Sequence, residues 1–205
     1  LSSLVGSEMC IRDRFNTVNE LTQKVCKPWR IAIPVGKDSL SMKTIWQNNK
    51  KTNLSPQSLV ISAFAKIKNV SNSITPQLIN KDELVLVYLD LSKNKKRLGG
   101  SILAEVTQQT NLETPNLENL KEFPRIYNFL ATNINKKRIY SFHDISDGGL
   151  VVSAVEMMLA GGCGLNLDFS KISFFNDSNN LFSEELGVLF CLLYTSDAAD
   201  DAGSV

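Results

Sequence analysis

Between residues 139 and 160, an apolar segment, a polar loop and a long apolar stretch follow one another. Residues 139–142 contain the branched and aromatic side chains typical of a strand, and residues 150–160 have the periodicity and composition of a buried helix. The loop between them, residues 143–149, ends in two glycines. This stretch therefore predicts a strand, a polar loop at its carboxyl end, and a helix that packs in the core.

The loop carries two carboxylates, Asp144 and Asp147, on either side of Ser146. Mg²⁺ prefers oxygen ligands and typically takes one or two protein carboxylates, with water and phosphate oxygens completing its shell. The loop is therefore the best candidate in the sequence for a site that binds a nucleotide with Mg²⁺. A structural alternative is that Asp147 caps the following helix, as Asp often does. Both interpretations hold together if Asp144 binds the metal and Asp147 caps the helix.

Two other groups of titratable residues have simpler explanations. His143 is the only histidine of the chain, and we interpret it as a hydrogen-bonded structural residue rather than as a base. Glu184 and Glu185 are adjacent carboxylates that fit either a paired-carboxylate site or, more commonly, an exposed turn of helix. No nucleophile and base stand out as a pair in the sequence, so we assign no catalytic residue.

A second polar loop, residues 36–44, follows a segment predicted to be a strand, residues 29–35. It does not match a phosphate-binding P-loop, because the first glycine of that motif is missing. Its glycine would still expose backbone N–H groups, and its lysine and hydroxyls would donate to a phosphate. The alternative is a solvated turn. The residues concerned are Gly36, Lys37, Asp38 and Ser39.

Further elements are predicted from apolar periodicity. Strands are expected at residues 58–67, 83–91, 165–169 and 188–193, and the apolar run at 83–91 is typical of a central strand. Helices are expected at residues 15–25, 117–134 and 181–186, the first ending before Pro28 and the second bent or broken near Pro124. The polar segment 68–81 predicts a domain boundary, and the basic run 93–97 predicts a solvated turn.

Composition and charge exclude several classes of function. The chain has 22 Lys and Arg against 21 Asp and Glu, a net charge of +1, so no global field favours nucleic acid or a membrane as partner. It has no run of the roughly 18 apolar residues that a membrane helix needs. Its four cysteines contain no CxxC pair, which fits neither a zinc site nor a disulfide framework. We therefore expect a cytoplasmic protein.

Several segments are more specific together than any one of them alone. In order, they are IPVGKDSLSMKT, SLVISAFA, TPQL, HDISDGGL with the following GGCG, and FSEELG. This series closely resembles the large single-chain phosphoribosylformylglycinamidine synthases, which are also called formylglycinamide ribonucleotide amidotransferases. The resemblance covers residues 15–190 and implies an internal fragment of the synthetase region of such an enzyme.

The resemblance implies an α/β (α+β) fold of the aminoimidazole ribonucleotide synthetase superfamily. Residues 15–70 would be the end of a ferredoxin-like N-terminal half, and residues 71–190 would be an α/β C-terminal domain. Residues 1–14 and 191–205 look like translated adapter sequence, and we expect both tails to pack poorly. A lineage-specific tail is the alternative.

The resemblance also implies a function. In this family ATP phosphorylates the amide oxygen of formylglycinamide ribonucleotide, and ammonia displaces the phosphate to give the amidine. The family pattern assigns Asp144 to Mg²⁺ and Ser146 to the nucleotide, ATP or ADP. We add Lys37, Asp38 and Ser39 to the nucleotide-binding residues. The ammonia would come from a glutaminase domain outside this chain, and we expect the chain alone to be inactive.

Two alternatives to this function remain. In the first alternative, the chain belongs to another enzyme of the same superfamily, such as aminoimidazole ribonucleotide synthetase, selenophosphate synthetase or thiamine-monophosphate kinase. In the second, it is a non-catalytic module that holds a structural nucleotide. The segment GKDSLSMKT argues against the other enzymes. Turnover of bound nucleotide separates a catalytic from a non-catalytic domain.

Overall fold

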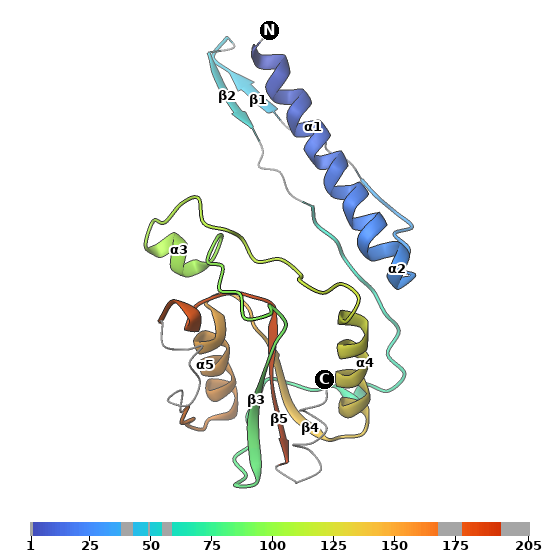
Figure 1. The fold of residues 1–205 in the computed structure, drawn as a ribbon, viewed down its shortest axis with the longest axis vertical. Helices are drawn as coiled ribbons and strands as arrows, with labels where there is room; N and C mark the ends of the chain where they lie inside the picture. The colour runs from blue at the N-terminus through green and yellow to red at the C-terminus, as the bar shows by residue number, and fades with distance from the viewer. Residues whose placement is uncertain (1, 38–42, 49, 55–58, 168–177, 194–205) are drawn as a thin grey trace. The chain divides into compact units, whose positions relative to one another are not determined.

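A computed structural model describes residues 2–37, 43–48, 50–54, 59–167 and 178–193 (Figure 1). The chain divides into two compact units, Leu1–Lys66 and Ile67–Val205. The domain boundary expected from the sequence lies between residues 70 and 71. Among the described helices, none is both long and apolar enough to span a bilayer.

The first unit begins with a long helical segment, which consists of α1 (Ser2–Leu21), a π-helical turn (Thr22–Cys26) and α2 (Lys27–Trp29). The helix continues past Pro28, where we expected it to end. A proline ring normally clashes with the carbonyl four residues earlier, and the wider π turn before Pro28 relieves that clash. The segment ends at Arg30, whose φ of 56° is left-handed.

An antiparallel hairpin completes the described part of this unit, with β1 (Lys43–Trp46) paired to β2 (Lys51–Leu54). The strands expected at residues 29–35 and 58–67 are not found among the described residues. A strand needs a neighbour for its backbone N–H and C=O groups, and no described strand pairs with either segment. Apolar side chains there are exposed, Val60 by 87% and Phe64 by 96%. The ferredoxin-like arrangement of this half stays a prediction.

The second unit is built on a three-stranded sheet of β3 (Leu84–Asp90), β4 (Ile139–Asp144) and β5 (Gly187–Leu193). The order is β3–β5–β4, and both neighbouring pairs are antiparallel. The predicted strands at residues 83–91, 139–142 and 188–193 are confirmed. The expectation that residues 83–91 form the central strand is wrong, because β5 lies between the other two described strands.

Two helices cover opposite faces of this sheet, α4 (Phe123–Asn135) on one side and α5 (Gly149–Gly161) on the other (Figure 1). Successive side chains of a strand point to opposite faces, so β5 supplies alternate residues to two cores. One core joins Leu189 and Cys191 of β5 to Leu150, Ala154 and Met157 of α5, and the other joins Val188 and Phe190 to Leu130 of α4.

The connections contain short helices: a 3₁₀ turn at Val70–Asn72, α3 (Ile102–Val106) and a 3₁₀ turn at Ser178–Leu181. The helix expected at residues 117–134 is confirmed only from Phe123 onward, with Pro124 in its first turn, and residues 117–122 form no helix. The helix expected at residues 181–186 is wrong, since the 3₁₀ turn ends at Leu181. Residues 165–167 form no strand, and residues 168–169 of that predicted strand lie outside the described residues.

The sheet extends into the segment 191–205, which we expected to pack poorly. Cys191 is only 4% exposed, and Leu192 and Leu193 pair with Val85 and Leu84 of β3. The expectation is therefore wrong for residues 191–193, because the apolar strand continues through them. Residues 194–205 lie outside the described part of the chain. At the other end, residues 2–14 belong to α1.

The two cores lead to a first prediction about stability. Met157→Ala is expected to lower the free energy of unfolding by about 2–5 kcal/mol, because the side chain of Met157 is 0% exposed and its loss leaves a cavity. Leu159→Ala, on the same helix but 77% exposed, is the control and is expected to change it by less than about 0.5 kcal/mol. Urea denaturation measures both, and equal effects would contradict the assignment of Met157 to the core.

Candidate functional site

Three chain segments meet at one edge of the sheet. Because β3 and β4 are each antiparallel to β5, they are parallel to each other, and their carboxyl ends share this edge with the start of β5. Asp90 lies opposite Gly187, and Asp144 lies opposite Val188. Neighbouring strands are about 4.8 Å apart, so the backbones of the two aspartates are roughly 10 Å apart across β5.

We call residues 145–149, the polar loop that follows β4, the acidic loop. It leaves the sheet at Asp144, whose side chain is 75% exposed. The backbone N–H of Ile145 donates to the carbonyl of Gly187 at 2.9 Å, which ties the loop to β5. The N–H of Ser146 lies 3.4 Å from Oγ of Ser153 in α5. The carboxylate of Asp144 is thus open to solvent, while the backbone beside it is held in place.

The turn into α5 requires two left-handed residues in succession, Gly148 with φ 86° and Gly149 with φ 74°. A Cβ at Gly149 would lie 2.7 Å from the backbone carbonyl carbon of Phe182, so a larger residue would not fit there. The N-cap of α5 is Gly148. The expectation that Asp147 caps this helix is therefore wrong, because the glycine turn moves the cap position one residue onward and leaves Asp147 exposed.

Both ring nitrogens of His143 lie close to oxygen atoms. Its Nδ1 lies 2.7 Å from the carbonyl oxygen of Asp144, and its Nε2 lies 3.0 Å from the Glu156 carboxylate on α5. The side chain is 14% exposed. These contacts connect the end of β4 to the middle of α5, so the interpretation of His143 as a structural residue agrees with its geometry.

Glu184, which is distant in sequence, accepts a hydrogen bond from the backbone of the acidic loop. Its Oε1 accepts hydrogen bonds from the N–H of Gly148 at 2.7 Å and from the N–H of Ile102 at 2.8 Å. The first donor precedes α5, and the second begins α3. Neither role was foreseen, because nothing local to Glu184 identifies partners so far away in the chain.

Glu185 forms a buried ion pair with Arg97. Nε of Arg97 lies 2.6 Å from Oε1 of Glu185, and Nη2 lies 2.7 Å from Oε2, so the pair is bidentate. The side chains are 7% and 3% exposed. The backbone N–H of Arg97 also donates to Oε1 at 2.9 Å. The solvated turn predicted at residues 93–97 is confirmed for Lys93 to Lys96, which are exposed. It is wrong for Arg97, which is buried.

Other charges surround the guanidinium. Glu118 accepts from Nη1 of Arg97 at 2.8 Å and pairs with Lys95 at 3.1 Å. The hydrogen bond from Lys95 lowers the pKa of Glu118, with Arg97 adding to the effect. The hydrogen bonds to Glu185 raise the pKa of Arg97 above its usual range. In the same region, burial and the nearby carboxylates of Asp90 and Glu185 raise the pKa of Tyr88.

Asp90 is committed to the turn that follows β3. Its carboxylate accepts from the N–H of Ser92 at 2.8 Å, from the hydroxyl of Ser92 at 2.6 Å and from the N–H of Asn94 at 2.9 Å. These bonds use both carboxylate oxygens. The carboxylate of Asp90 is therefore occupied by hydrogen bonds within the protein, whereas that of Asp144, at the same edge of the sheet, is open to solvent.

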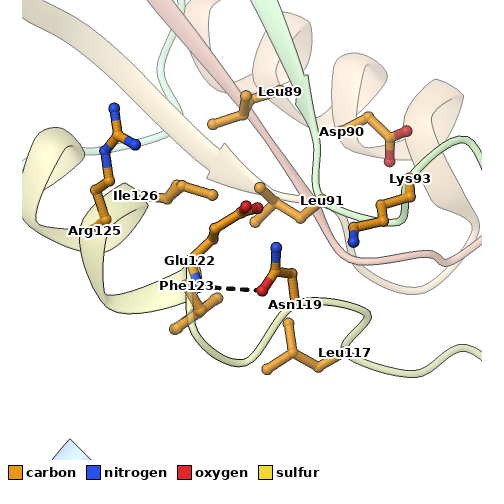
Figure 2. Close-up of a pocket in the computed structure, with 10 residues that line it drawn as sticks. All are labelled: Leu89, Asp90, Leu91, Lys93, Leu117, Asn119, Glu122, Phe123, Arg125 and Ile126. Atoms are coloured by element: carbon orange, nitrogen blue, oxygen red, sulfur yellow. Dashed lines mark hydrogen bonds between the residues drawn. The ribbon is translucent and has the colours of Figure 1, made fainter. Parts of the chain in front are cut away.

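A cavity of about 250 Å³ lies between this turn and the start of α4 (Figure 2). Its wall mixes apolar side chains with charges of both signs, and the N–H of Glu122 donates to Oδ1 of Asn119 at 3.3 Å. Neither Asp144 nor Ser146 lines it. The lining residues are Leu89, Asp90, Leu91, Lys93, Leu117, Asn119, Glu122, Phe123, Arg125 and Ile126.

The predicted site residues do not all lie in one part of the chain. Asp144, the last residue of β4, and Ser146, in the loop after it, lie close together in the second unit. Lys37 is an exposed residue of the first unit, and Asp38 and Ser39 lie outside the described residues. Within the described ranges, no three His, Cys, Asp or Glu side chains group closely enough to hold a metal ion by themselves. Any cation at Asp144 would therefore depend on ligands beyond these side chains.

The ion pair predicts a large effect of Arg97 on stability. Arg97→Ala is expected to lower the free energy of unfolding by about 3–5 kcal/mol, because it leaves Glu185 buried without its countercharge. The control is Lys96→Ala at an exposed position of the same turn, which should change it by less than about 0.5 kcal/mol. Denaturation in urea at neutral pH compares the two, and a small effect of Arg97→Ala would contradict the assignment of a structural ion pair.

Two family descriptions match the chain, one in each half. Residues 6–66 match the FGAR-AT PurM_N-like domain, and residues 81–204 match the C-terminal domain of AIR synthase related proteins. The ranges include residues 6–14 and 191–204, which we had assigned to terminal tails. In this order the two matches fit the synthetase region of formylglycinamide ribonucleotide amidotransferases, and by the second, which covers more than half of its length, the chain belongs to the AIR synthase related family.

Proposed function

We propose that the chain is part of an ATP-dependent carbon–nitrogen ligase that converts formylglycinamide ribonucleotide, glutamine and ATP to formylglycinamidine ribonucleotide. The observation that carries the proposal is the succession of the two family matches on one chain, the first of which is specific to the amidotransferase. The nucleotide would bind with Mg²⁺ at the acidic loop. Ammonia would be delivered by a glutaminase domain that is not among the matched domains.

The hydrogen bonds of the acidic loop favour a site that acts through a cation. In a phosphate-binding glycine loop, unpaired backbone N–H groups point at the ligand. Here four N–H groups of the loop, those of Ile145, Ser146, Gly148 and Gly149, have acceptors within the protein. The exposed carboxylate of Asp144 would repel a phosphate directly. A divalent cation removes that conflict, because it binds the carboxylate and the phosphate together.

Each residue of the loop has a distinct role in this proposal. Asp144 would contribute one carboxylate oxygen to Mg²⁺, which when bound supplies positive charge to the phosphates. The hydroxyl of Ser146 would donate to a phosphate oxygen. Gly148 and Gly149 shape the turn that presents both side chains. Lys37, Asp38 and Ser39 of the first unit are proposed as further nucleotide-binding residues, and no residue of the chain is proposed to take part in a covalent step.

Three substitutions test the division of roles. Asp144→Asn should weaken binding of Mg–ADP by more than tenfold, because it removes the negative charge that offsets the cation. Ser146→Ala should weaken it less than Asp144→Asn does, by at least about tenfold, since a hydrogen bond to a charged group is worth roughly 1.5–3 kcal/mol and about 1.4 kcal/mol is a factor of ten. Asp147→Asn should leave the affinity unchanged, because Asp147 is exposed and does not cap α5. Calorimetric titration of Mg–ADP into the chain measures all three.

A second measurement detects weak binding. Mn²⁺ replaces Mg²⁺ as a paramagnetic probe, and Mn–ADP should broaden the amide NMR signals of residues 144–149 in the unaltered chain but not in Asp144→Asn. Broadening that persists in Asp144→Asn and disappears in Asp147→Asn would mean that Asp147 is the ligand. No broadening in the unaltered chain would contradict the proposed site.

A further inference from the structure

The segment before β5 contains adjacent glutamates that face different parts of the second unit. Glu185 is directed to Arg97, while Glu184 is directed to the backbone of Gly148 and Ile102. The two carboxylates thus have different hydrogen-bond partners. The pair that the sequence suggested is therefore two residues with separate contacts.

The Arg97–Glu185 pair fixes where Glu184 lies. Besides the bidentate contact, the hydroxyl of Ser183 donates to the carbonyl of Arg97 at 3.2 Å. The N–H of Leu91 donates to the carbonyl of Leu186 at 3.0 Å. Residues on both sides of Glu184 are thus anchored to the chain that follows β3, and its carboxylate is half-buried between α3 and the acidic loop.

Glu184 accepts from the N–H of the residue at which α5 starts. The N-cap of this helix is Gly148, which has no side chain of its own, and its backbone N–H donates to Glu184. Ser101 caps α3 by accepting from the N–H of Ala104 at 3.2 Å, but this leaves the N–H of Ile102 to Glu184. One carboxylate oxygen therefore fastens the acidic loop to the beginning of α3.

We propose that Glu184 is a positioning residue of the nucleotide site. It holds Gly148 in place and thereby fixes the loop that presents Asp144 and Ser146, without contacting the nucleotide itself. This assignment rests on the proposed binding of Mg–nucleotide at that loop. It predicts that loss of the carboxylate loosens the loop locally and lowers affinity, while the sheet behind the loop is unaffected.

The test compares Glu184→Ala, Glu184→Gln and the control Glu105→Ala, which alters an exposed glutamate on α3. In Glu184→Ala, hydrogen exchange at the amides of Gly148 and Ile102 should be at least tenfold faster, with exchange at Leu189 unchanged, and Mg–ADP should bind about tenfold more weakly. Glu184→Gln keeps an acceptor oxygen, so its affinity should fall within about threefold of the unaltered chain. Glu105→Ala should change neither property.

The outcomes separate this assignment from the proposed function. If the unaltered chain binds Mg–ADP and Glu184→Ala binds it equally well, the positioning role is wrong and the proposed site is retained. If Glu184→Gln loses as much affinity as Glu184→Ala, the charge acts directly on the ligand and the assignment is also overturned. If the unaltered chain does not bind Mg–ADP or Mn–ADP, the proposed function fails, and the positioning assignment fails with it.

Discussion

The buried ion pair between Arg97 and Glu185 determines how the segments at the carboxyl ends of β3 and β4 are assembled. Its side chains come from two segments that are distant in sequence, one after β3 and one before β5. A buried charge without its partner is costly, by roughly 3–5 kcal/mol, so the two segments are strongly favoured to lie together. The position of Glu184, and through it the position of Gly148, follows from this pairing.

Much of the second unit could be predicted from local patterns. The strand, polar loop and helix at residues 139–160 form as expected, because apolar periodicity and paired glycines act over short distances in the chain. The start of α4 beside Pro124 also follows from one residue's covalent structure, because proline is tolerated in the first turn of a helix and not in its interior. The same local patterns correctly placed Ser146 in a loop after a strand, whereas His143 and Asp144, which we expected in that loop, are the last two residues of the strand.

Other features depend on contacts that a local pattern cannot contain. Glu184 and Glu185 were ambiguous, and Arg97 was assigned to solvent, because their partners lie far away in the sequence. Asp147 satisfied the local rule for a helix cap, but the two left-handed glycines after it moved the helix start. In the first unit, two apolar segments with strand composition have no described neighbour to pair with. Composition alone does not provide that neighbour.

The place of β5 has a consequence for the order in which the second unit folds. β3 and β4 are not hydrogen-bonded to each other, and each depends on β5, which is the last of the three strands in the sequence. Both cores also need side chains from β5. During synthesis, neither helix can complete its packing until β5 has left the ribosome, and the facing edges of β3 and β4 remain open to other chains until then.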